Sequence, residues 1–319
     1  MFEKLEQELK NIINLENKPK IILGLSGGPD SVYLFLFLNK LAQEDKIELI
    51  CAHLNHEWRT EAIIDVEFCK NLCAKNNIKF IAGKASELEI AIKFNGSLEE
   101  IGRKLRRYFF NKILKQEDAN YIALAHHLQD QQETFFWRII RGTTLKGLSG
   151  MKMLQEAYIR PLLNIEKKDI LDYLDKNNIK YLIDYTNYSD KYLRNRIRKY
   201  VLPALEKVDS RFSKKFLTTL NFLQEEEAFL NKITENNFNI IFKNINNKYT
   251  GNLTEFKKLD IILQKRILIY WLDKIKVKFT ASNSFLLEIL RFLNNPNGGK
   301  HKINQDFSII KKQNNFMVL

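Results

Sequence analysis

The residues with the clearest chemical meaning are Ser26-Gly27-Gly28-Pro29-Asp30-Ser31, which directly follow the apolar run from Ile21 to Leu25. Adjacent glycines let the backbone turn tightly and expose N–H groups, and the apolar stretch from Val32 to Leu38 predicts a helix whose positive N-terminus points at the same place. The segment has no GxxxxGK[ST] pattern and no lysine of its own, so it is not a Walker A loop. We expect it to bind phosphate, which makes nucleotide chemistry the first hypothesis over an ordinary strand-turn-helix connection.

A second group of polar residues runs from His126 to Thr134, where a strand ends and a helix begins. Asp130 and Glu133 are three residues apart and so share one face near the positive end of that helix. Carboxylates beside bound phosphates need a cation, and Mg²⁺ prefers a few carboxylates together with phosphate oxygens. The alternative is that these acids only favour the helix dipole. We predict Asp30, Asp130, Glu133 and His126 as catalytic residues, with Asp30 and Asp130 as metal ligands.

Four of the five histidines form two pairs, His53 with His56 and His126 with His127. A structural zinc site is disfavoured because the cysteines lack CxxC spacing. We expect the histidines to donate hydrogen bonds to phosphate or base, and we assign His53 to nucleotide binding.

Two basic helices are predicted. The first begins at the capping box Ser97–Glu100 and presents Arg103 and Arg107 on one face. The second runs from Tyr192 to Leu205 and presents Arg194 and Arg198 on one face, where they could follow a nucleic-acid backbone.

The elements that must position these residues alternate between short β-branched runs and longer helical periods. We predict strands at 21–25, 47–54, 78–82 and 120–125, and helices at 31–42, 60–76, 98–115 and 128–140. This order indicates βαβ units around a parallel sheet, in which ligands bind beyond the carboxyl ends of the strands. The loops 26–31, 53–59 and 126–133 should therefore converge on one site.

Beyond this region we predict a helix at 166–177 and a strand at 181–184. From residue 209 the chain changes to long amphipathic helices, at 212–234, 259–274 and 282–293, followed by a hairpin within 302–319. We therefore predict two domains, 1–208 and 209–319, the second mainly helical.

Composition agrees with this organisation. The chain has 319 residues, of which 45% are hydrophobic, enough for more than one core. Its formal net charge of +13 suits a polyanionic partner, although biased composition could also produce it. Three cysteines without a pairing pattern favour a reducing cytoplasm, and no apolar stretch is long enough to span a membrane. We expect a cytoplasmic protein without a membrane partner.

Taken together, the motifs resemble the tRNA(Ile)-lysidine synthases, a family of the PP-loop ATP pyrophosphatases with an adenine nucleotide alpha hydrolase-like fold. The resemblance covers about the first 205 residues in family order. The helical remainder of the chain resembles the family's substrate-binding domain more loosely. The matching segments are Ser26–Ser31, His53–Arg59, Arg103 with Arg107-Tyr108, His126–Thr134, Arg141-Gly142 with Gly147-Leu148, Arg160–Leu163 and Arg194–Arg198.

The resemblance implies an AMP-forming ligase that uses ATP and Mg²⁺. The wobble cytidine of an isoleucine tRNA with a CAU anticodon would be adenylated at its C2 oxygen, and free lysine would displace AMP to form lysidine. It implies that Ser26, Gly27, Gly28, Pro29, Asp30, Ser31, His53 and Arg103 bind ATP, and that Arg107, Arg141, Arg194 and Arg198 bind tRNA. Whether the chain forms a homodimer is left open.

Three positions depart from the family pattern. Gln129 stands where an Asp is frequent, Gly102 precedes Arg103 in place of Ala, and Asp184-Tyr185-Thr186-Asn187 replaces Asp-x-Ser-Asn. None removes a group that the chemistry requires. The competing hypotheses are a cytidine 2-thiolase, which generally needs cysteines that this pattern lacks, and a non-catalytic RNA-binding relative.

Overall fold

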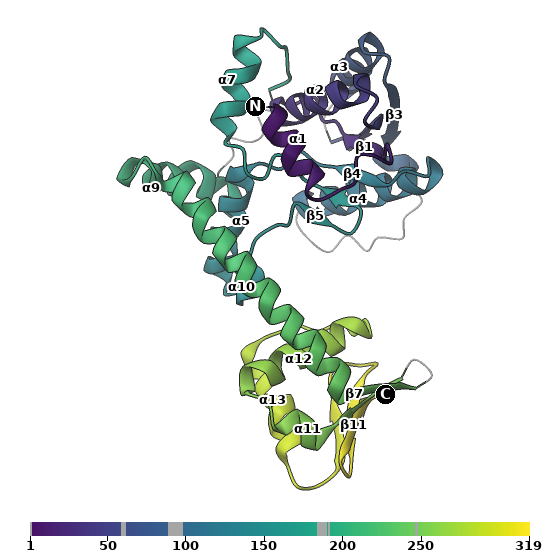
Figure 1. Ribbon diagram of the computed structural model, residues 1–319, viewed down its shortest axis with the longest axis vertical. Coiled ribbons are helices and arrows are strands. Elements are labelled where there is room, and N and C mark those ends of the chain that lie inside the picture. Colours follow the sequence, from purple (N-terminus) through teal and green to yellow (C-terminus); the bar gives the residue numbers. More distant parts are fainter. Residues whose placement is uncertain (1, 59–61, 89–97, 184–189, 191, 246–247) are drawn as a thin grey trace. The chain divides into compact units, whose positions relative to one another are not determined.

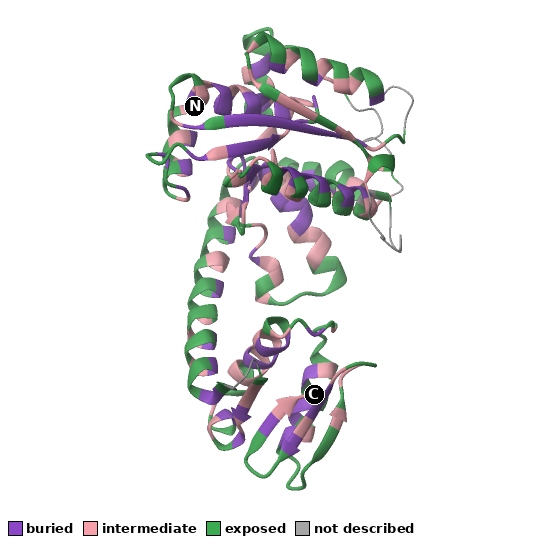
Figure 2. Ribbon diagram, turned by 90° about the vertical axis from the view of Figure 1, so that its right-hand side faces the viewer, coloured by how far each residue is buried: buried purple, intermediate pink, exposed green. Residues whose placement is uncertain are grey.

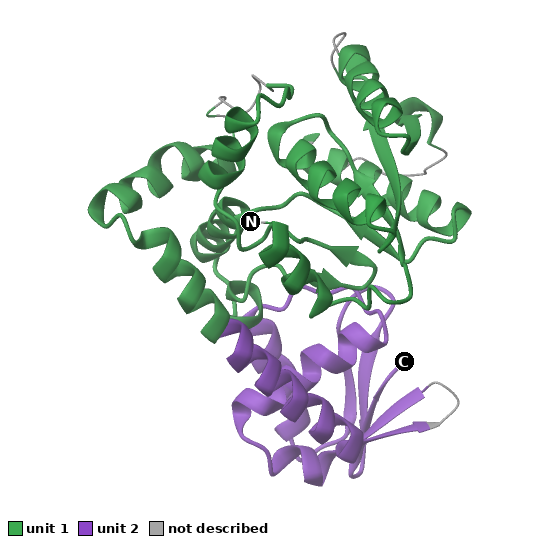
Figure 3. Ribbon diagram, turned by 45° about the horizontal axis from the view of Figure 1, so that its top comes forward, with its two compact units in different colours: residues 1–222 green, residues 223–319 purple. Residues whose placement is uncertain are grey.

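The chain forms two compact units, residues 1–222 and 223–319, in a computed structural model (Figure 3). The structure describes residues 2–58, 62–88, 98–183, 190, 192–245 and 248–319. The division falls inside helix α10 (Phe212–Ile241), beyond the expected boundary near residue 208. The first turns of α10 belong to the first unit because Phe216 and Leu220 are buried against Leu128.

A six-stranded sheet in the order β3-β2-β1-β4-β6-β5 forms the centre of the first unit (Figure 1). All neighbouring strands are parallel except the edge pair β5 and β6. The strands are β1 (Lys20–Gly24), β2 (Glu48–Asn55), β3 (Lys79–Lys84), β4 (Tyr121–Ala123), β5 (Leu154–Gln155) and β6 (Tyr158–Ile159). The predicted parallel sheet is therefore confirmed.

Helices cover both faces of this sheet because successive strand residues point to opposite sides. On one face of the sheet, Ile21 and Leu23 of β1 belong to a core that also contains side chains from the helices covering that face. On the other face, Ile22 packs with Phe109 and Phe110. The first core contains residues of α1 (Phe2–Lys10), α2 (Pro29–Gln43), α3 (Ala62–Lys75) and α7 (Lys167–Lys176), and the second contains residues of α4 (Leu98–Gln116). The central strands are consequently buried along most of their length (Figure 2).

The strand order reverses direction between β1 and β4. The chain leaves β1 toward β2 and β3, then returns to form β4 on the other side of β1. In open α/β sheets this switch point, at the carboxyl ends of the strands, is where ligands bind. The loop after β1 and the start of α5 (Leu128–Arg141) after β4 both begin there.

Two expectations after β6 need correction. Residues 181–183 form no strand, and residue 184 lies outside the described residues. The predicted basic helix is continuous but not regular: α8 (Leu193–Arg196) leads into a π-helical turn (Ile197–Val201) and then α9 (Leu202–Val208). Pro203 lies in the first turn of α9, and because proline lacks an N–H the regular bonding pattern is interrupted just before it.

The second unit combines the end of α10 with three further helices and a five-stranded antiparallel sheet in the order β7-β8-β11-β10-β9. The predicted hairpin is β10–β11, with Lys312 paired to Asn315. The elements are α11 (Leu253–Lys257), α12 (Ile261–Lys274), α13 (Asn283–Asn294), β7 (Phe242–Ile245), β8 (Lys248–Asn252), β9 (Gly299–Lys302), β10 (Ser308–Lys312) and β11 (Asn315–Val318). Trp271 and Phe316 are fully buried at its core. None of the helices in the described part of the chain has the length and apolar character of a membrane span.

Candidate active site

The loop after β1 is stabilised by hydrogen bonds of its own serine hydroxyl groups. Ser31 Oγ donates to Gly28 O at 2.9 Å and accepts from the Ser26 N–H at 3.2 Å. Gly27 has φ +82°, a conformation that favours glycine, and a Cβ there would lie 2.7 Å from the Leu182 side chain. Pro29 occupies the first turn of α2, which fixes the helix start at the loop. The predicted phosphate-binding geometry, a glycine turn leading into a helix N-terminus, is therefore present.

Asp30 forms an ion pair with a lysine from a distant part of the chain. Its Oδ1 atom lies 2.5 Å from the ammonium of Lys167, at the start of α7. The backbone N–H of Lys167 donates to Gln129 Oε1 at 2.8 Å, and the Leu128 N–H donates to Ile165 O at 3.0 Å. Gln129, where the family often has an Asp, thus fixes the start of α7 to the start of α5. Sequence reasoning missed Lys167, because a single lysine at the start of an amphipathic helix gives no signal.

The two predicted metal ligands converge on one histidine. His127 Nε2 lies 3.7 Å from Asp30 Oδ2 and 3.7 Å from Asp130 Oδ2. Asp130 also accepts the His127 N–H at 2.9 Å. Burial tends to raise the pKa of Asp130, but His127, His126, the His127 N–H and Arg198 outweigh it and lower the pKa, so this carboxyl stays ionised. Among the described residues, no three His, Cys, Asp or Glu side chains could hold a metal by themselves. Two carboxylates with phosphate oxygens and water fit Mg²⁺.

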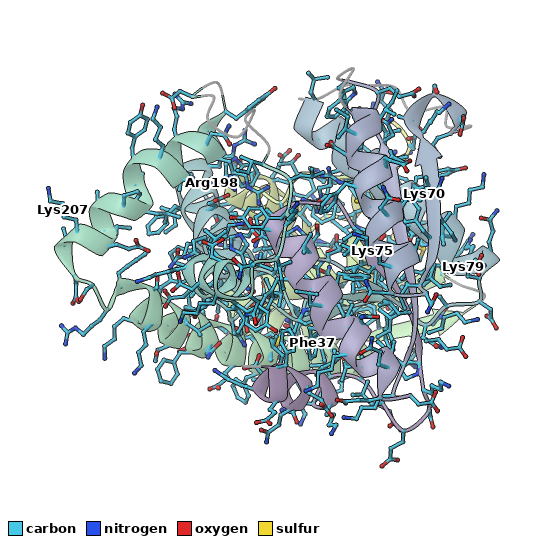
Figure 4. All side chains as sticks on the ribbon, turned by 90° about the horizontal axis from the view of Figure 1, so that it is seen from above. Phe37, Lys70, Lys75, Lys79, Arg198 and Lys207 are labelled. Atoms are coloured by element: carbon cyan, nitrogen blue, oxygen red, sulfur yellow. The ribbon has the colours of Figure 1, made fainter. Side chains whose placement is uncertain are left out.

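The carboxylate of Glu133 is already paired and is not open to a metal ion. It is 1% exposed and makes two contacts with Arg198, Nε to Oε1 at 2.5 Å and Nη2 to Oε2 at 3.1 Å. Burial raises the pKa of Glu133 even though Arg198 opposes the change. Arg194 donates to Thr134 Oγ1 at 2.8 Å. The two arginines predicted to follow RNA phosphates therefore face α5; in Figure 4 Arg198 lies on the inner side of its helix and Lys207 at the outer end.

The predicted histidines lie at the same edge of the sheet. His53 is buried, and its Nδ1 lies 2.8 Å from Leu25 O, so it supports the start of the loop from behind. His56 stacks on Trp58 with ring centroids 4.6 Å apart. Burial lowers the pKa of both His56 and His126 to about 4. The Nδ1 atoms of His56, His126 and His127 are buried and have no hydrogen-bond partner among the residues that the structure describes. Buried polar atoms of this kind need a ligand or water.

A group of arginines lies between α4 and α5. Burial lowers the pKa of Arg138 and of Arg160, and the positive charge of Arg103 on α4 adds to both shifts. Among the described residues, Arg160 Nε is buried without a hydrogen-bond partner. Arg107 is exposed, pairs with Glu156 at 2.8 Å and lies over Tyr158. This concentration of positive charge can stabilise an anion. Arg138 was missed by the sequence reasoning, and Arg160 was noticed only as part of a motif.

The remaining predicted residues divide into two sets. Arg141 lies at the end of α5 with its guanidinium 4.3 Å from the centre of the Trp137 ring, an exposed position that could stack on a base. Six of the residues quoted earlier lie outside the described residues: Arg59, Ser97, Asp184, Tyr185, Thr186 and Asn187.

A family model described as the PP-loop domain matches residues 1–205. The fold agrees: the U34-tRNA thiolase NcsA from Methanococcus maripaludis, solved with its [4Fe-4S] cluster, superposes with a TM-score of 0.58 over 70% of this chain and 79% of that chain, at 20% sequence identity. The first unit is thus a PP-loop domain with a helix-covered, mostly parallel sheet.

Curated relatives show which family of PP-loop proteins the chain belongs to. A tRNA(Ile)-lysidine synthase from Caldanaerobacter subterraneus is 31% identical over 100% of this chain and 69% of its own length. Those from Bacillus cereus (31%) and Clostridioides difficile (36%) match 91% and 84% of this chain. The chain belongs to the tRNA(Ile)-lysidine synthase family. It spans 63% of the length of the Bacillus cereus relative.

Proposed function

We propose that this protein ligates lysine to C2 of the wobble cytidine of a CAU-anticodon isoleucine tRNA, with ATP converted to AMP and pyrophosphate. The observation that carries the proposal is the convergence of the Ser26–Ser31 loop, Asp30 and Asp130 at the switch point of the sheet, in a chain whose relatives are named tRNA(Ile)-lysidine synthases.

The first step is adenylation of the cytidine. The loop amides and the N-terminus of α2 would hold the β and γ phosphates, and Asp30 with Asp130 would hold Mg²⁺, which neutralises charge on the leaving pyrophosphate. The C2 oxygen attacks the α-phosphorus, and the bond from that phosphorus to the pyrophosphate oxygen breaks. The anticodon loop is single-stranded, so its base can enter the site without the breaking of a duplex.

The second step needs a neutral lysine amine. That amine attacks C2 of the adenylated cytidine, AMP leaves, and a base accepts the released proton. Of the two carboxylates on α5, Glu133 is the better proton acceptor, because burial raises its pKa while the pKa of Asp130 is lowered. The competing thiolation chemistry is disfavoured, because Cys51 and Cys69 are buried thiols whose pKa burial raises.

Incubation with ATP, Mg²⁺, labelled lysine and a CAU-anticodon transcript tests the proposal directly. Digestion of the RNA should give labelled lysidine, with AMP and pyrophosphate formed in equal amounts. A transcript with a different wobble base is the matched control and should stay unlabelled. ADP as the nucleotide product, or binding of RNA without any turnover of ATP, would contradict the proposal.

A further inference from the structure

The loop after β1 lacks the lysine that phosphate-binding loops of the Walker type carry, yet a lysine ammonium is present beside it. It comes from Lys167, 137 residues later in the chain, and it pairs with Asp30 on the first turn of α2. The side chains of Lys167 and Asp30 are 29% and 27% exposed, so the ion pair lies at the edge of the site and not within the core.

The backbone of Lys167 is fixed while its side chain spans to the loop. Gln129 accepts the Lys167 N–H, and Ile165 accepts the Leu128 N–H, so both contacts tie this segment to the start of α5. On its other side, the chain after α7 covers the loop, with the Leu182 N–H donating to Gly27 O at 2.9 Å. A flexible four-carbon side chain on a fixed backbone can move its charge between two nearby anions at little cost.

The charges at the site explain why the ammonium sits on Asp30. Asp30 and Asp130 both lie close to His127, and Lys167 balances one of them. A bound triphosphate with Mg²⁺ would change this balance, because the metal ion would neutralise the Asp30 carboxylate and the phosphates would bring new negative charge. We infer that Lys167 is a phosphate-binding residue that leaves Asp30 when ATP binds and contacts the β and γ phosphates, supplying from α7 the cation that the loop lacks.

This inference rests on one part of the proposed function, namely that the Ser26–Ser31 loop binds the triphosphate of ATP. It predicts different effects on the binding of ATP and of AMP, because AMP has no β or γ phosphate for the ammonium to contact. A lysine that only stabilised the docking of α7 would affect both nucleotides equally or neither.

The test compares Lys167→Met with the wild-type chain in calorimetric binding of ATP–Mg²⁺ and of AMP. The variant should bind ATP about 10- to 100-fold more weakly, the range for loss of a charged hydrogen bond, and AMP with unchanged affinity. Lys167→Arg, which keeps the charge, should recover most of the ATP affinity. Lys168→Met removes a neighbouring exposed lysine and is the matched control, with both affinities unchanged.

Thermal unfolding of each variant shows whether the fold is intact, and the Arg variant keeps the inference testable if the Met variant unfolds. Equal weakening of ATP and AMP, or unchanged ATP binding in Lys167→Met, would overturn the role of Lys167. Failure of the wild-type chain to bind ATP more tightly than AMP would instead contradict the proposed use of the loop.

Discussion

Among the described residues, each unit has a buried glutamate paired with an arginine, and the two arginines are bonded differently. In residues 223–319, Glu227 is 3% exposed and accepts two hydrogen bonds from Arg266, which also donates to Asn231 and Thr234. In residues 1–222, Glu133 is 1% exposed, but the Arg198 side chain is 45% exposed and two bonds to Glu133 hold it.

The difference in hydrogen bonding between the two pairs indicates which pair stabilises the fold and which lies in the candidate site. The Glu227 pair has further hydrogen bonds to neighbouring side chains, which is typical of an ion pair that stabilises a fold. At the start of α5, which carries Glu133, the buried Nδ1 atoms of His126 and His127 have no partner among the described residues, and neither does Nε of Arg160. A fold retains such groups where a ligand completes them. The predictions below test this contrast, from the largest expected effect to the smallest.

Asp130→Asn should reduce the conversion of ATP to AMP about 100-fold or more while binding of tRNA stays nearly unchanged, because the substitution removes charge from the metal and phosphate site. Rates of pyrophosphate release and filter binding of tRNA measure the two effects. Asp172→Asn, on the exposed side of α7, is the control and should be silent. Unchanged turnover would remove Asp130 from the site.

Glu227→Gln should destabilise its unit by about 3 kcal/mol, because it leaves a mostly buried arginine without its counter-ion. Glu133→Gln should cost only about 1 kcal/mol, because water can solvate the half-exposed Arg198. Denaturant unfolding followed by fluorescence compares the two variants. Equal losses would mean that Glu133, too, is held mainly for stability.

Acid should destabilise the first unit through His126 and His56. Burial lowers the pKa of each to about 4, below the ordinary value of 6.5, so the unfolded chain takes up the proton first. Stability is therefore full above about pH 6.5, declines as the pH falls toward 4 and then levels off. Unfolding free energies at several pH values should show a shallower decline for His126→Gln. His301→Gln, in the other unit, is the comparison and should leave the decline unaltered.

Gln129→Ala removes a side-chain amide that is already hydrogen-bonded within the candidate site. Loss of the bond to the Lys167 N–H should cost about 1 kcal/mol and loosen the start of α7. The exposed Gln155→Ala should change stability by less than about 0.5 kcal/mol. Thermal unfolding midpoints measure both, and a silent Gln129→Ala would show that this hydrogen bond adds nothing to the other contacts that hold α7.

The alternation of strands and helices, and the meeting of the loops after β1 and β4, were predictable because periodicity and chain order determine them. The short strands β5 and β6 were not, since two residues each are too few to show a period. The sheet of the second unit was predicted only in its last hairpin, because β7 follows α10 without a break and carries polar residues.

The candidate site shows the same limit. The placement of Asp30, Asp130, His126 and His127 at one edge of the sheet was predictable because each follows a strand in a recognisable segment. His53 could be placed there because it lies near the end of β2. Contacts between distant segments, such as Lys167 with Asp30 and Arg198 with Glu133, leave no trace in local spacing. Helical spacing did place Arg194 and Arg198 on one face, but it could not show that this face lies against α5.

Strand β1 has neighbours on both edges and helices over both faces, and Ile21, Ile22 and Leu23 are fully buried. Its amides should consequently be among the last in the first unit to exchange with deuterated solvent, since only global opening exposes them. The Ser26–Ser31 loop begins two residues after Gly24, the last residue of this strand. We therefore expect one end of the loop to be anchored to one of the slowest-exchanging segments of the first unit, so that any rearrangement on ligand binding should be limited to the residues beyond Leu25.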